Sequence, residues 1–375
     1  MPTLNRNPYS LVNLSGSVSP ADPTGRGAGV AINGQRAAST SILLDGAENS
    51  DIFTAAIAQT TPLESVAEFQ VITSNFSAEY GRASGGIVNV STRAGTNRFR
   101  GNVFAFNRNS ALAANTFDNN AKGAPRPFFN RNQFGYAVDG PIIKNKLFFS
   151  NSTEWTRVRS TATLFAYVPT QAFINSSNAN TRNFFSAYGK LNAAPVGAPV
   201  IIGGGATPNF QLVSYTAPVD AGGGTPQNTY STVARVDWNI NDKTQLYGRY
   251  AQQKPEFLQG SQANSPYSGF DIGTTTLNNN MLVNLTRTFG NNLVSNTKAA
   301  YRRINTKNTL ASDPSTPTLY FFANQTATFK GDPIALPGYL PFNPGSGLPV
   351  SGIQQLYQLN EDINYTEIKK AGVLS

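Results

Sequence analysis

The stretch GGIVNVSTRAGTNRFRGNVFAF, residues 85–106, decides the fold because two different β patterns meet in it. Its first part is a glycine-led apolar strand, and from Phe99 aromatic and polar residues alternate with a period of two. The polar, basic segment from Thr92 to Asn97 separates the two parts. A helix or a plain hairpin turn is more usual at such a place in a soluble domain. We therefore expect a joint between two architectures, with Gly95 and Gly101 giving the backbone its freedom to turn.

Upstream of the joint, residues 1–98 are typical of a compact mixed α/β unit. The apolar run 42–44 followed by Asp45-Gly46 predicts a strand and then a turn. The segment TTPLESVAEF, residues 60–69, predicts a short helix that is capped by Thr61, with Pro62 in its first position and Glu64 completing a capping box. Strands are expected to follow at 69–73 and 85–91.

Downstream of the joint, the period of two predicts strands at 99–108, 132–140, 146–157, 229–240, 244–252, 279–289 and 293–304. A tilted strand needs about 9–11 residues to cross a bilayer. Connections 141–145, 241–243 and 290–292 are short, whereas 109–131, 158–228, 253–278 and the tail after 304 are long. Outer-membrane barrels alternate short periplasmic turns with long outer loops. The pattern therefore predicts a membrane wall with the 141–145 turn in the periplasm.

Two of these strands keep charge off one face. In 229–240 the neutral face includes Trp238, and Arg235 and Asp237 lie on the other face. In 293–304 the neutral face includes Tyr301, opposite Lys298 and Arg302. A basic residue that faces lipid at the midplane costs about 2–4 kcal/mol, so we expect these charges to point into the lumen. Trp238 and Tyr301 are expected near strand ends, in the aromatic girdles. For 99–108 and 146–157 the pattern does not indicate which face meets lipid.

The composition argues against an enzyme and against a nucleic-acid partner. Cysteine and histidine are both absent, which removes disulfides, thiolate nucleophiles, the commonest general base and most transition-metal sites. The net charge of +9 is spread along the chain rather than clustered. No stretch approaches the roughly 18 apolar residues of a membrane-spanning helix. We therefore expect no enzyme activity, no catalytic residue, no cofactor, no metal and no nucleic acid.

Several residue groups imitate functional motifs, but each has a simpler reading. Gly25, Gly27 and Gly29 lack the spacing of a dinucleotide-binding loop and are read as a flexible turn. Glu64 and Glu68 could imitate a paired acid–base site, but they are read as capping and solvated residues. A calcium site is not expected at Asp45, Glu48 and Asp51, because the calcium-loop pattern is absent. Aromatic residues in the long loops are expected to pack on one another more often than on a ligand; they are Phe117, Phe128, Phe129, Phe184, Phe185, Tyr188 and Tyr320 to Phe322.

Three stretches resemble a known family: AINGQRAASTSILLDGAENSD (31–51), PLESVAEFQVITSNFSAEYGRASGGIVNVSTRAGTNRFRG (62–101) and RNQFGYAVDGPIIKNKLFFSNSTEW (131–155). The middle stretch is similar to the end of the plug domain of TonB-dependent outer-membrane receptors of the Oar-like type. Glu64, Tyr80-Gly81 and the run GGIVNV match the family pattern, and Ser91 before Thr92 departs from it slightly. The resemblance implies a barrel of about 22 strands that is filled by the plug.

The resemblance and the strand pattern together give a fold prediction. The fold class is mainly β, with a small α/β plug in residues 1–98 and, in 99–375, the N-terminal part of an antiparallel transmembrane β-barrel with long extracellular loops. About seven strands of a larger barrel are expected. No secretory signal is seen in the opening residues, and no final strand at the end, so we expect a fragment whose Met1 is an internal or misassigned start.

The function implied by the resemblance is import of a scarce, large solute through a plugged barrel in the cell outer membrane. Expected partners are outer-membrane lipid, the TonB energy-coupling complex and an unknown extracellular ligand; the TonB-contacting segment is not seen in this sequence. The substrate-binding residues are unknown, because specificity is expected in the loops. On strand pattern alone, a soluble or surface-attached β-rich binding protein, such as an adhesin, is the alternative, since half-buried sheets alternate in the same way.

Overall fold

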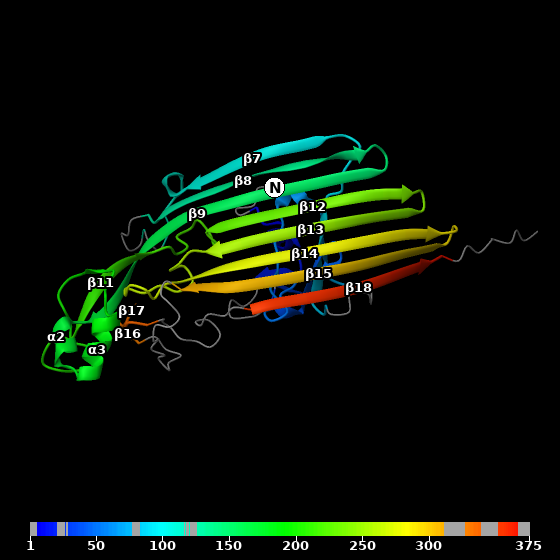
Figure 1. The fold of residues 1–375 in the computed structure, drawn as a ribbon. Coiled ribbons are helices and arrows are strands. Elements are labelled where there is room, and N and C mark those ends of the chain that lie inside the picture. The colour runs from blue at the N-terminus through cyan, green and yellow to red at the C-terminus, as the bar shows by residue number, and fades with distance from the viewer. Residues whose placement is uncertain are drawn as a thin grey trace, which may run out of the picture.

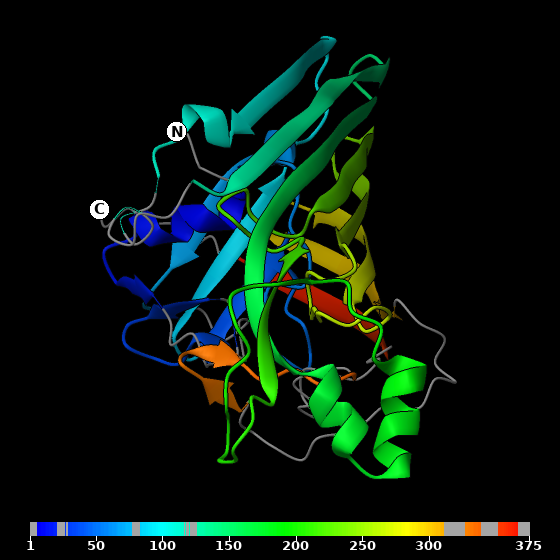
Figure 2. The same cartoon turned by 90° about the vertical axis from the view of Figure 1, so that its left-hand side faces the viewer.

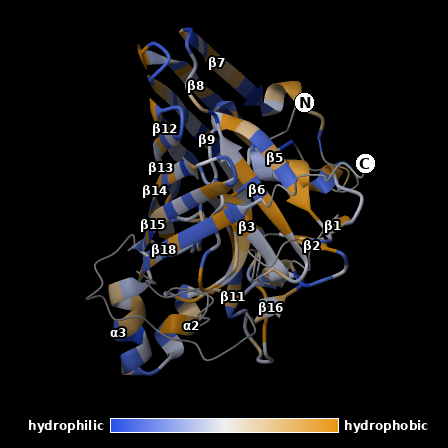
Figure 3. Cartoon of the chain, turned by 90° about the vertical axis from the view of Figure 1, so that its right-hand side faces the viewer, coloured by the Kyte–Doolittle hydropathy of each residue, from blue (hydrophilic) through white to orange (hydrophobic). Residues whose placement is uncertain are grey.

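The computed structural model of the chain describes residues 6–20, 27, 29–76, 83–115, 117, 120, 126–310, 327–338 and 352–366. Figure 1 shows a large, curved antiparallel sheet, which we call the wall, and the N-terminal segment lying behind it. The N-terminal segment, residues 6–92 as far as they are described, is called the plug unit. Figures 2 and 3 show that the plug unit lies on the inner side of the curved wall.

The wall is a meander of antiparallel strands in the spatial order β7-β8-β9-β12-β13-β14-β15-β18. Its strands are β7 (Arg100–Asn109), β8 (Phe128–Ile143), β9 (Leu147–Pro169), β12 (Asn228–Asn241), β13 (Thr244–Phe257), β14 (Ile272–Phe289), β15 (Leu293–Leu310) and β18 (Gly352–Tyr365). Short turns join β8 to β9, β12 to β13 and β14 to β15, and long connections join the others. One end of the wall, the short-turn end, therefore carries tight turns, and the opposite end, the long-loop end, carries extended loops.

All seven expected wall strands are confirmed, with different bounds. β7 is shifted by one residue, and the other six are longer than expected, β9 most of all. An eighth wall strand, β18, was not expected. It lies in the tail after 304, and Glu361 on its neutral side weakens the charge pattern.

The two faces of the wall are confirmed where the sequence shows them cleanly. On β12, Val236 and Trp238 are 43% and 46% exposed on the outer side. Arg235 and Asp237 point inward, where they contact Thr92 of the plug unit and Gly95 of the linker that follows it. In Figure 3, hydrophobic and hydrophilic colours alternate along β7 and β8. The expected position of Tyr301 is wrong: it lies in the middle of β15, opposite Met281 and Tyr357, because β15 continues to Leu310.

The plug unit is built on a mixed sheet in the order β4-β3-β6-β5. Its strands are β3 (Thr40–Leu44), β4 (Ala47–Glu48), β5 (Val66–Ile72) and β6 (Gly86–Thr92), and β3 pairs with β6 in parallel. The short elements η1 (Pro8–Leu14), β1 (Val18–Pro20), β2 (Val30–Ile32) and η2 (Ala37–Ser39) pack beside this sheet. Its core consists of branched and aromatic side chains and includes two from the wall; the buried members are Tyr9, Val12, Val30, Ile32, Ile42, Leu44, Val88, Val90, Val233 and Ala251.

The expected capped helix at 60–69 is wrong. Residues Leu63–Ser65 form a single 3₁₀ turn, η3, and strand β5 begins immediately at Val66. Pro62 precedes the turn in an extended conformation without a side-chain cap, and the buried Thr61 hydroxyl makes no hydrogen bond among the described residues. Val66 is β-branched and pairs with Thr92 of β6, so sheet pairing overrides the local helix signal.

Residues 158–228 were expected to form one long loop, which is also wrong. β9 continues to Pro169 and pairs there with β11 (Phe210–Ala217), which also pairs with β10 (Ala194–Pro195). Helices α2 (Gln171–Ser176) and α3 (Ala179–Tyr188) lie between them, beyond the end of the wall (Figure 2). A second apolar core joins this segment to the β13–β14 loop and to the short pair β16 (Thr328–Phe329) and β17 (Asp332–Pro333); it includes Ala166, Val168, Val213, Tyr267, Phe270, Ile272 and Ala335.

The remaining short element is η4 (Ser110–Leu112), which follows β7. Among the helices of the described residues, none has the length and apolar character that crossing a membrane requires.

A candidate site between the plug and the wall

The turn between β3 and β4 carries the carboxylate at the centre of the candidate site. Asp45 and Gly46 have φ values of 54° and 78°, the left-handed conformation that a two-residue type I′ hairpin requires. The sequence prediction of a turn here is confirmed. The Asp45 carboxylate is buried and accepts hydrogen bonds from Thr92, at 2.7 Å from the backbone nitrogen and 2.8 Å from the hydroxyl. Asp45 therefore connects the first plug hairpin to the last residue of β6.

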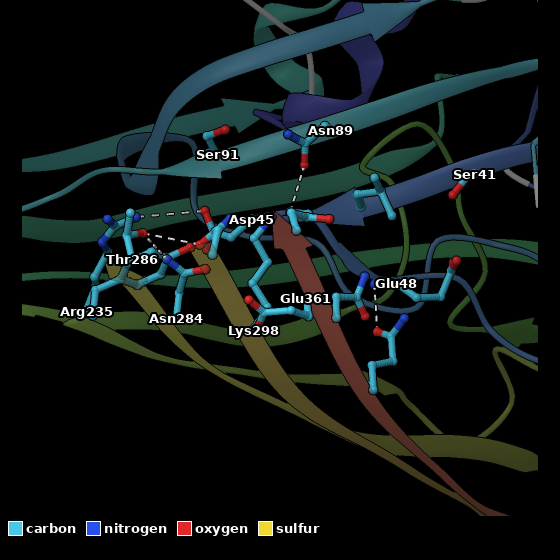
Figure 4. A pocket seen from close by; sticks show the side chains of 17 residues that line it. Ser41, Asp45, Glu48, Asn89, Ser91, Arg235, Asn284, Thr286, Lys298 and Glu361 are labelled. Carbon is cyan, nitrogen blue, oxygen red and sulfur yellow. Dashed lines mark hydrogen bonds and ion pairs between the residues drawn. The ribbon is translucent and has the colours of Figure 1, made fainter. Parts of the chain in front are cut away.

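Two wall arginines approach the same carboxylate. Arg249 on β13 is fully buried, and its Nε lies 2.8 Å from Asp45 Oδ2. Arg235 on β12 is 3.9 Å from Asp45 Oδ1, and it pairs with Asp237 at 2.7 Å. Figure 4 shows Arg235 and Asp45 meeting across the boundary between wall and plug. One plug carboxylate is thus surrounded by two wall cations.

Both arginines also contact neutral groups. Arg249 Nη2 donates to Asn280 Oδ1 at 2.9 Å, and Arg235 Nη1 donates to the Thr92 carbonyl at 3.1 Å. The Arg235 guanidinium lies 3.9 Å from the centre of the Tyr247 ring. Buried charges are tolerated when they are paired and hydrogen-bonded. These bonds hold the end of β6 and the end of β3 against the wall.

A polar cavity of about 610 Å³ opens beside these residues, toward the short-turn end (Figure 4). The plug contributes Ser41, Asp45, Glu48, Asn89 and Ser91, and the wall contributes Arg235, Tyr247, Asn284, Thr286, Asn296, Lys298 and Asn360. We call it the short-turn cavity. Its walls come from the two faces that must separate if the plug unit moves.

A second cavity of about 460 Å³ lies between plug and wall toward the long-loop end. Charged residues of both signs line this long-loop cavity. Arg6 of the plug unit pairs with Glu64 and lies 3.4 Å from Glu154 of β9. Glu154 also accepts a hydrogen bond of 2.7 Å from Gln133. Polar neutral groups fill the rest of the lining, among them Thr54, Thr60, Thr156, Gln253, Asn278 and Thr306.

The plug loop 51–60, which follows β4, is hydrogen-bonded to the wall at the long-loop end. Gln253 accepts from the Thr60 nitrogen at 3.0 Å and donates to its hydroxyl. Asn278 donates to the Ala58 carbonyl at 2.7 Å. Gln354 on β18 donates to Asp51 at 2.9 Å. Ser231 on β12 donates to the Thr60 carbonyl at 3.4 Å. Four wall strands therefore hold the plug loop 51–60.

Asp51 organises this loop. Burial acts to raise the Asp51 pKa, but hydrogen bonds from Thr54, Gln354 and the Phe53 amide outweigh it, and the pKa is lowered below its ordinary value. The charged form is therefore favoured in the folded chain.

The carboxylates considered from the sequence are not brought together. Asp45 pairs with the wall arginines, Glu48 accepts from the Ser50 amide, and Asp51 caps its own loop. Among the described residues no group of three or more acidic side chains is arranged to hold a metal ion. Glu64 pairs with Arg6, and Glu68 lies exposed on β5 rather than on a helix.

The aromatic and glycine motifs also have structural roles where they are described. Phe184 packs on Phe185 and on Tyr188, so the expected packing of loop aromatics on one another is confirmed there. Phe129 is buried, whereas Phe117 and Phe128 are exposed. Gly27 and Gly29 have positive φ, as a turn requires. The motif residues Gly25, Tyr80, Gly81 and Tyr320 to Phe322 lie outside the described residues.

Comparison with known proteins supports this architecture. The family model described as outer membrane beta barrel domain matches residues 91–370, and the TonB-dependent receptor plug domain matches residues 4–87. The chain belongs to the TonB-dependent receptor family. It is an outer-membrane protein of a transporter family rather than an enzyme.

One relative and one solved structure illustrate the extent of the match. The TonB-dependent transporter Oar of Myxococcus xanthus is 32% identical over 144 residues, which is 37% of this chain and 14% of that protein. The crystal structure of the outer membrane transporter YddB from Escherichia coli matches with a TM-score of 0.50 and 10% identity, over 82% of this chain and 38% of that one. This second likeness shows the fold alone. The receptor chain thus spans less than half the length of either of these two proteins.

The sequence did not identify Arg235 and Arg249 as the partners of Asp45. Arg235 was expected to face the lumen, which is confirmed, but no local signal connects Arg249 with Asp45, which is distant in the chain. Arg249 lies on the inner side because the strand register places it directly opposite the inward-facing Arg235.

Proposed function

We propose that this receptor forms the plugged section of an importer for a scarce, large solute, with the plug domain in residues 1–98 and the barrel beginning at residue 99. The support is the bonding of a separate mixed sheet to the inner side of a wall whose outer side exposes a band of apolar side chains. The contact between Asp45 and Arg249 is the observation that carries the proposal, because it closes the lumen with buried charges. A closed plug blocks free diffusion, so import requires its rearrangement.

The ligand is proposed to enter from the long-loop end. The long-loop cavity there combines plug and wall residues, so a bound solute contacts both parts at once. Its lining carries amides, hydroxyls and charges of both signs, which suits a polar solute with many hydrogen-bonding groups. Binding there changes the contacts that hold the loop 51–60 and weakens the plug's attachment at that end.

The energy for rearrangement is proposed to come from the periplasm through the TonB complex. Pulling on the plug unit from the short-turn end acts on the side where the short-turn cavity already separates plug from wall. Water in a polar cavity of this kind replaces the bonds that separation breaks. The ion pair at Asp45 is then the main contact to be broken.

The alternative of a soluble or surface-attached adhesin fits the molecule less well. The outer side of the wall exposes Val103, Val236, Trp238, Met281 and Val283, and it continues onto β18 with Tyr357 and Leu359. A continuous apolar band of this kind is expected against lipid.

Cysteine labelling tests the proposed orientation. The chain has no cysteine, so Lys144→Cys in the β8–β9 turn and Asn180→Cys on α3 each introduce a single thiol at an exposed position. A membrane-impermeant maleimide added to intact cells is expected to label Asn180→Cys but not Lys144→Cys. Lys144→Cys is expected to react after the outer membrane is permeabilised. Labelling of Lys144→Cys in intact cells would overturn the proposed orientation.

A further inference from the structure

An aromatic row crosses the outer side of the wall near the long-loop end. Phe134, Trp155 and Tyr230 occupy one register line on three neighbouring strands, β8, β9 and β12. Their ring centres are 5.8 Å and 5.7 Å apart. Their chain neighbours Glu154 and Ser231 contact the plug unit, so the row faces outward. Aromatic rows of this kind mark the boundary between hydrocarbon and headgroups in outer-membrane barrels.

A group of basic residues lies on the same side, next to the row. Arg157 and Arg159 follow Trp155 along β9 at successive outward positions toward the long-loop end, and Lys254 lies directly opposite Tyr230. We call Arg157, Arg159 and Lys254 the basic patch. None of the three belongs to an ion pair formed within the described chain. The nearby carboxylate Glu256 accepts a hydrogen bond from Asn228 at 2.8 Å. This part of the outer side therefore carries three positive charges and one negative charge.

The two arginines are held in place by neutral acceptors. Arg157 Nη1 donates to the carbonyls of Thr156 at 2.9 Å and Thr229 at 3.2 Å. Arg159 Nη1 donates to the Val158 carbonyl at 2.8 Å and to Asn228 Oδ1 at 3.1 Å. These bonds orient each guanidinium through a single nitrogen. A guanidinium that is oriented in advance loses less conformational entropy when it binds a phosphate with its other donors.

We propose that the basic patch binds the phosphate groups of outer-leaflet lipids. Three features point to a lipid: the patch faces away from the lumen, it adjoins the aromatic row on the long-loop side, and its excess positive charge complements phosphate. The inference rests on the orientation proposed above, in which the long-loop end faces outward. The hydrocarbon chains of the bound lipid lie along the aromatic row, and the phosphates meet the arginines.

Lipid binding by the purified chain tests this proposal. Diphosphoryl lipid A is added to the chain in uncharged detergent micelles, and the bound lipid is counted by native mass spectrometry. Arg157→Gln combined with Arg159→Gln is expected to weaken binding roughly 25-fold, since each basic residue contributes about 1 kcal/mol near an anionic surface. Lys144→Gln combined with Lys146→Gln removes the same charge at the short-turn end and is expected to change binding less than twofold.

Two further arms separate lipid from other anions. The unaltered chain is expected to bind dephosphorylated lipid A about as weakly as the arginine variant binds diphosphoryl lipid A. Because this arm uses the unaltered chain, it does not depend on the stability of the variant. Inorganic phosphate at matched concentration is expected not to compete. Equal binding of the two lipids, competition by inorganic phosphate, or an equal loss in the lysine control would each overturn the proposal. Micelle binding does not depend on orientation in cells, so its failure is distinct from failure of the labelling test.

Discussion

Arg235 and Arg249 lie directly opposite each other on β12 and β13. Like charges at such positions repel and destabilise a sheet. Asp45 of the plug unit approaches both, and its carboxylate relieves this repulsion. The wall strands thus carry an unfavourable pair that becomes acceptable when the plug is in place. This makes Asp45 a residue on which plug docking depends.

Asp45→Asn is expected to lower the free energy of unfolding by about 3–5 kcal/mol, because it leaves buried guanidinium charge without its partner. Urea unfolding in detergent micelles, followed by tryptophan fluorescence, measures the change. Asp242→Asn, at an exposed turn position, is the matched control and is expected to have little effect. Adding Arg249→Met to Asp45→Asn is expected to recover most of the loss. Equal stability of the Asp45 and Asp242 variants would refute the role given to this ion pair.

Glycine is required at position 95 for a different reason from the one that we expected. Neither Gly95 nor Gly101 is among the residues with positive φ, so backbone freedom does not explain them. A Cβ on Gly95 would lie 2.5 Å from the Phe149 carbonyl oxygen and 2.7 Å from Phe148 Cβ. Glycine is needed here because the linker between plug and barrel passes in contact with β9.

Gly95→Ala is therefore expected to push the linker away from the wall and to destabilise the chain by about 1–3 kcal/mol. Gly352→Ala is the control, because a Cβ at Gly352 meets nothing within 4 Å. Thermal unfolding of both variants in micelles measures the difference. A Gly95 variant that unfolds at the same temperature as the Gly352 variant would contradict the close approach.

At the scale of elements, the sequence predicted the wall strands from their period of two, and in β12 and β15 also from the exclusion of charge from one face. The predicted strands were too short where this pattern ends. β9 and β13 continue past the predicted bounds into residues such as Arg159 and Lys254, where the outer face is no longer neutral. β11 and the two helices were missed because they are held by a separate apolar core that forms only between distant loops.

The candidate site was predictable only in part. The Asp45-Gly46 turn follows from two adjacent residues and was found. The wall residues that pair with Asp45 are determined by the strand register, and no local sequence pattern predicts that register. The capping box at Thr61 failed for a related reason, because pairing of β5 with β6 determines the conformation there.

The loop 51–54 is expected to loosen in acid. The hydrogen bonds that lower the Asp51 pKa stabilise the loop fully above the ordinary pKa of about 3.9. That contribution is lost as the pH falls through the lower pKa of the folded chain. The charged group near this carboxylate from the wall is Arg302, which also interacts with Glu48.

Hydrogen exchange of the Phe53 and Thr54 amides, which both donate to Asp51, measures this loosening. After correction for intrinsic rates, protection is expected to be lower near pH 2 than near pH 6. In Asp51→Asn, protection is expected to be low at both values, because no charge is present to be lost. Protection that does not change with pH in the unaltered chain would exclude the proposed role of the Asp51 charge.

At the scale of the whole molecule, two of the sets of contacts that attach the plug unit to the wall lie apart from each other. One set surrounds Asp45 and faces the short-turn cavity. The other set joins the loop 51–60 to Gln253, Asn278 and Gln354 and faces the long-loop cavity. Because the two sets share no residue, the loop can open without breaking the ion pair. Under the function proposed above, a ligand at the long-loop end loosens the plug locally before any force acts at the other end.

Gln253→Leu combined with Asn278→Leu tests this independence. The double variant removes the two bonds of Gln253 to Thr60 and the bond of Asn278 to Ala58. Each bond is worth about 1 kcal/mol, so hydrogen exchange of residues 58–60 is expected to rise roughly 100-fold. Exchange in β3 and β6 is expected to stay unchanged. Gln252→Leu combined with Asn279→Leu, one residue along the same strands and bonded to each other, is the control. Faster exchange in β3 and β6 of the double variant would mean that the plug is released as one body, with both sets of contacts breaking together.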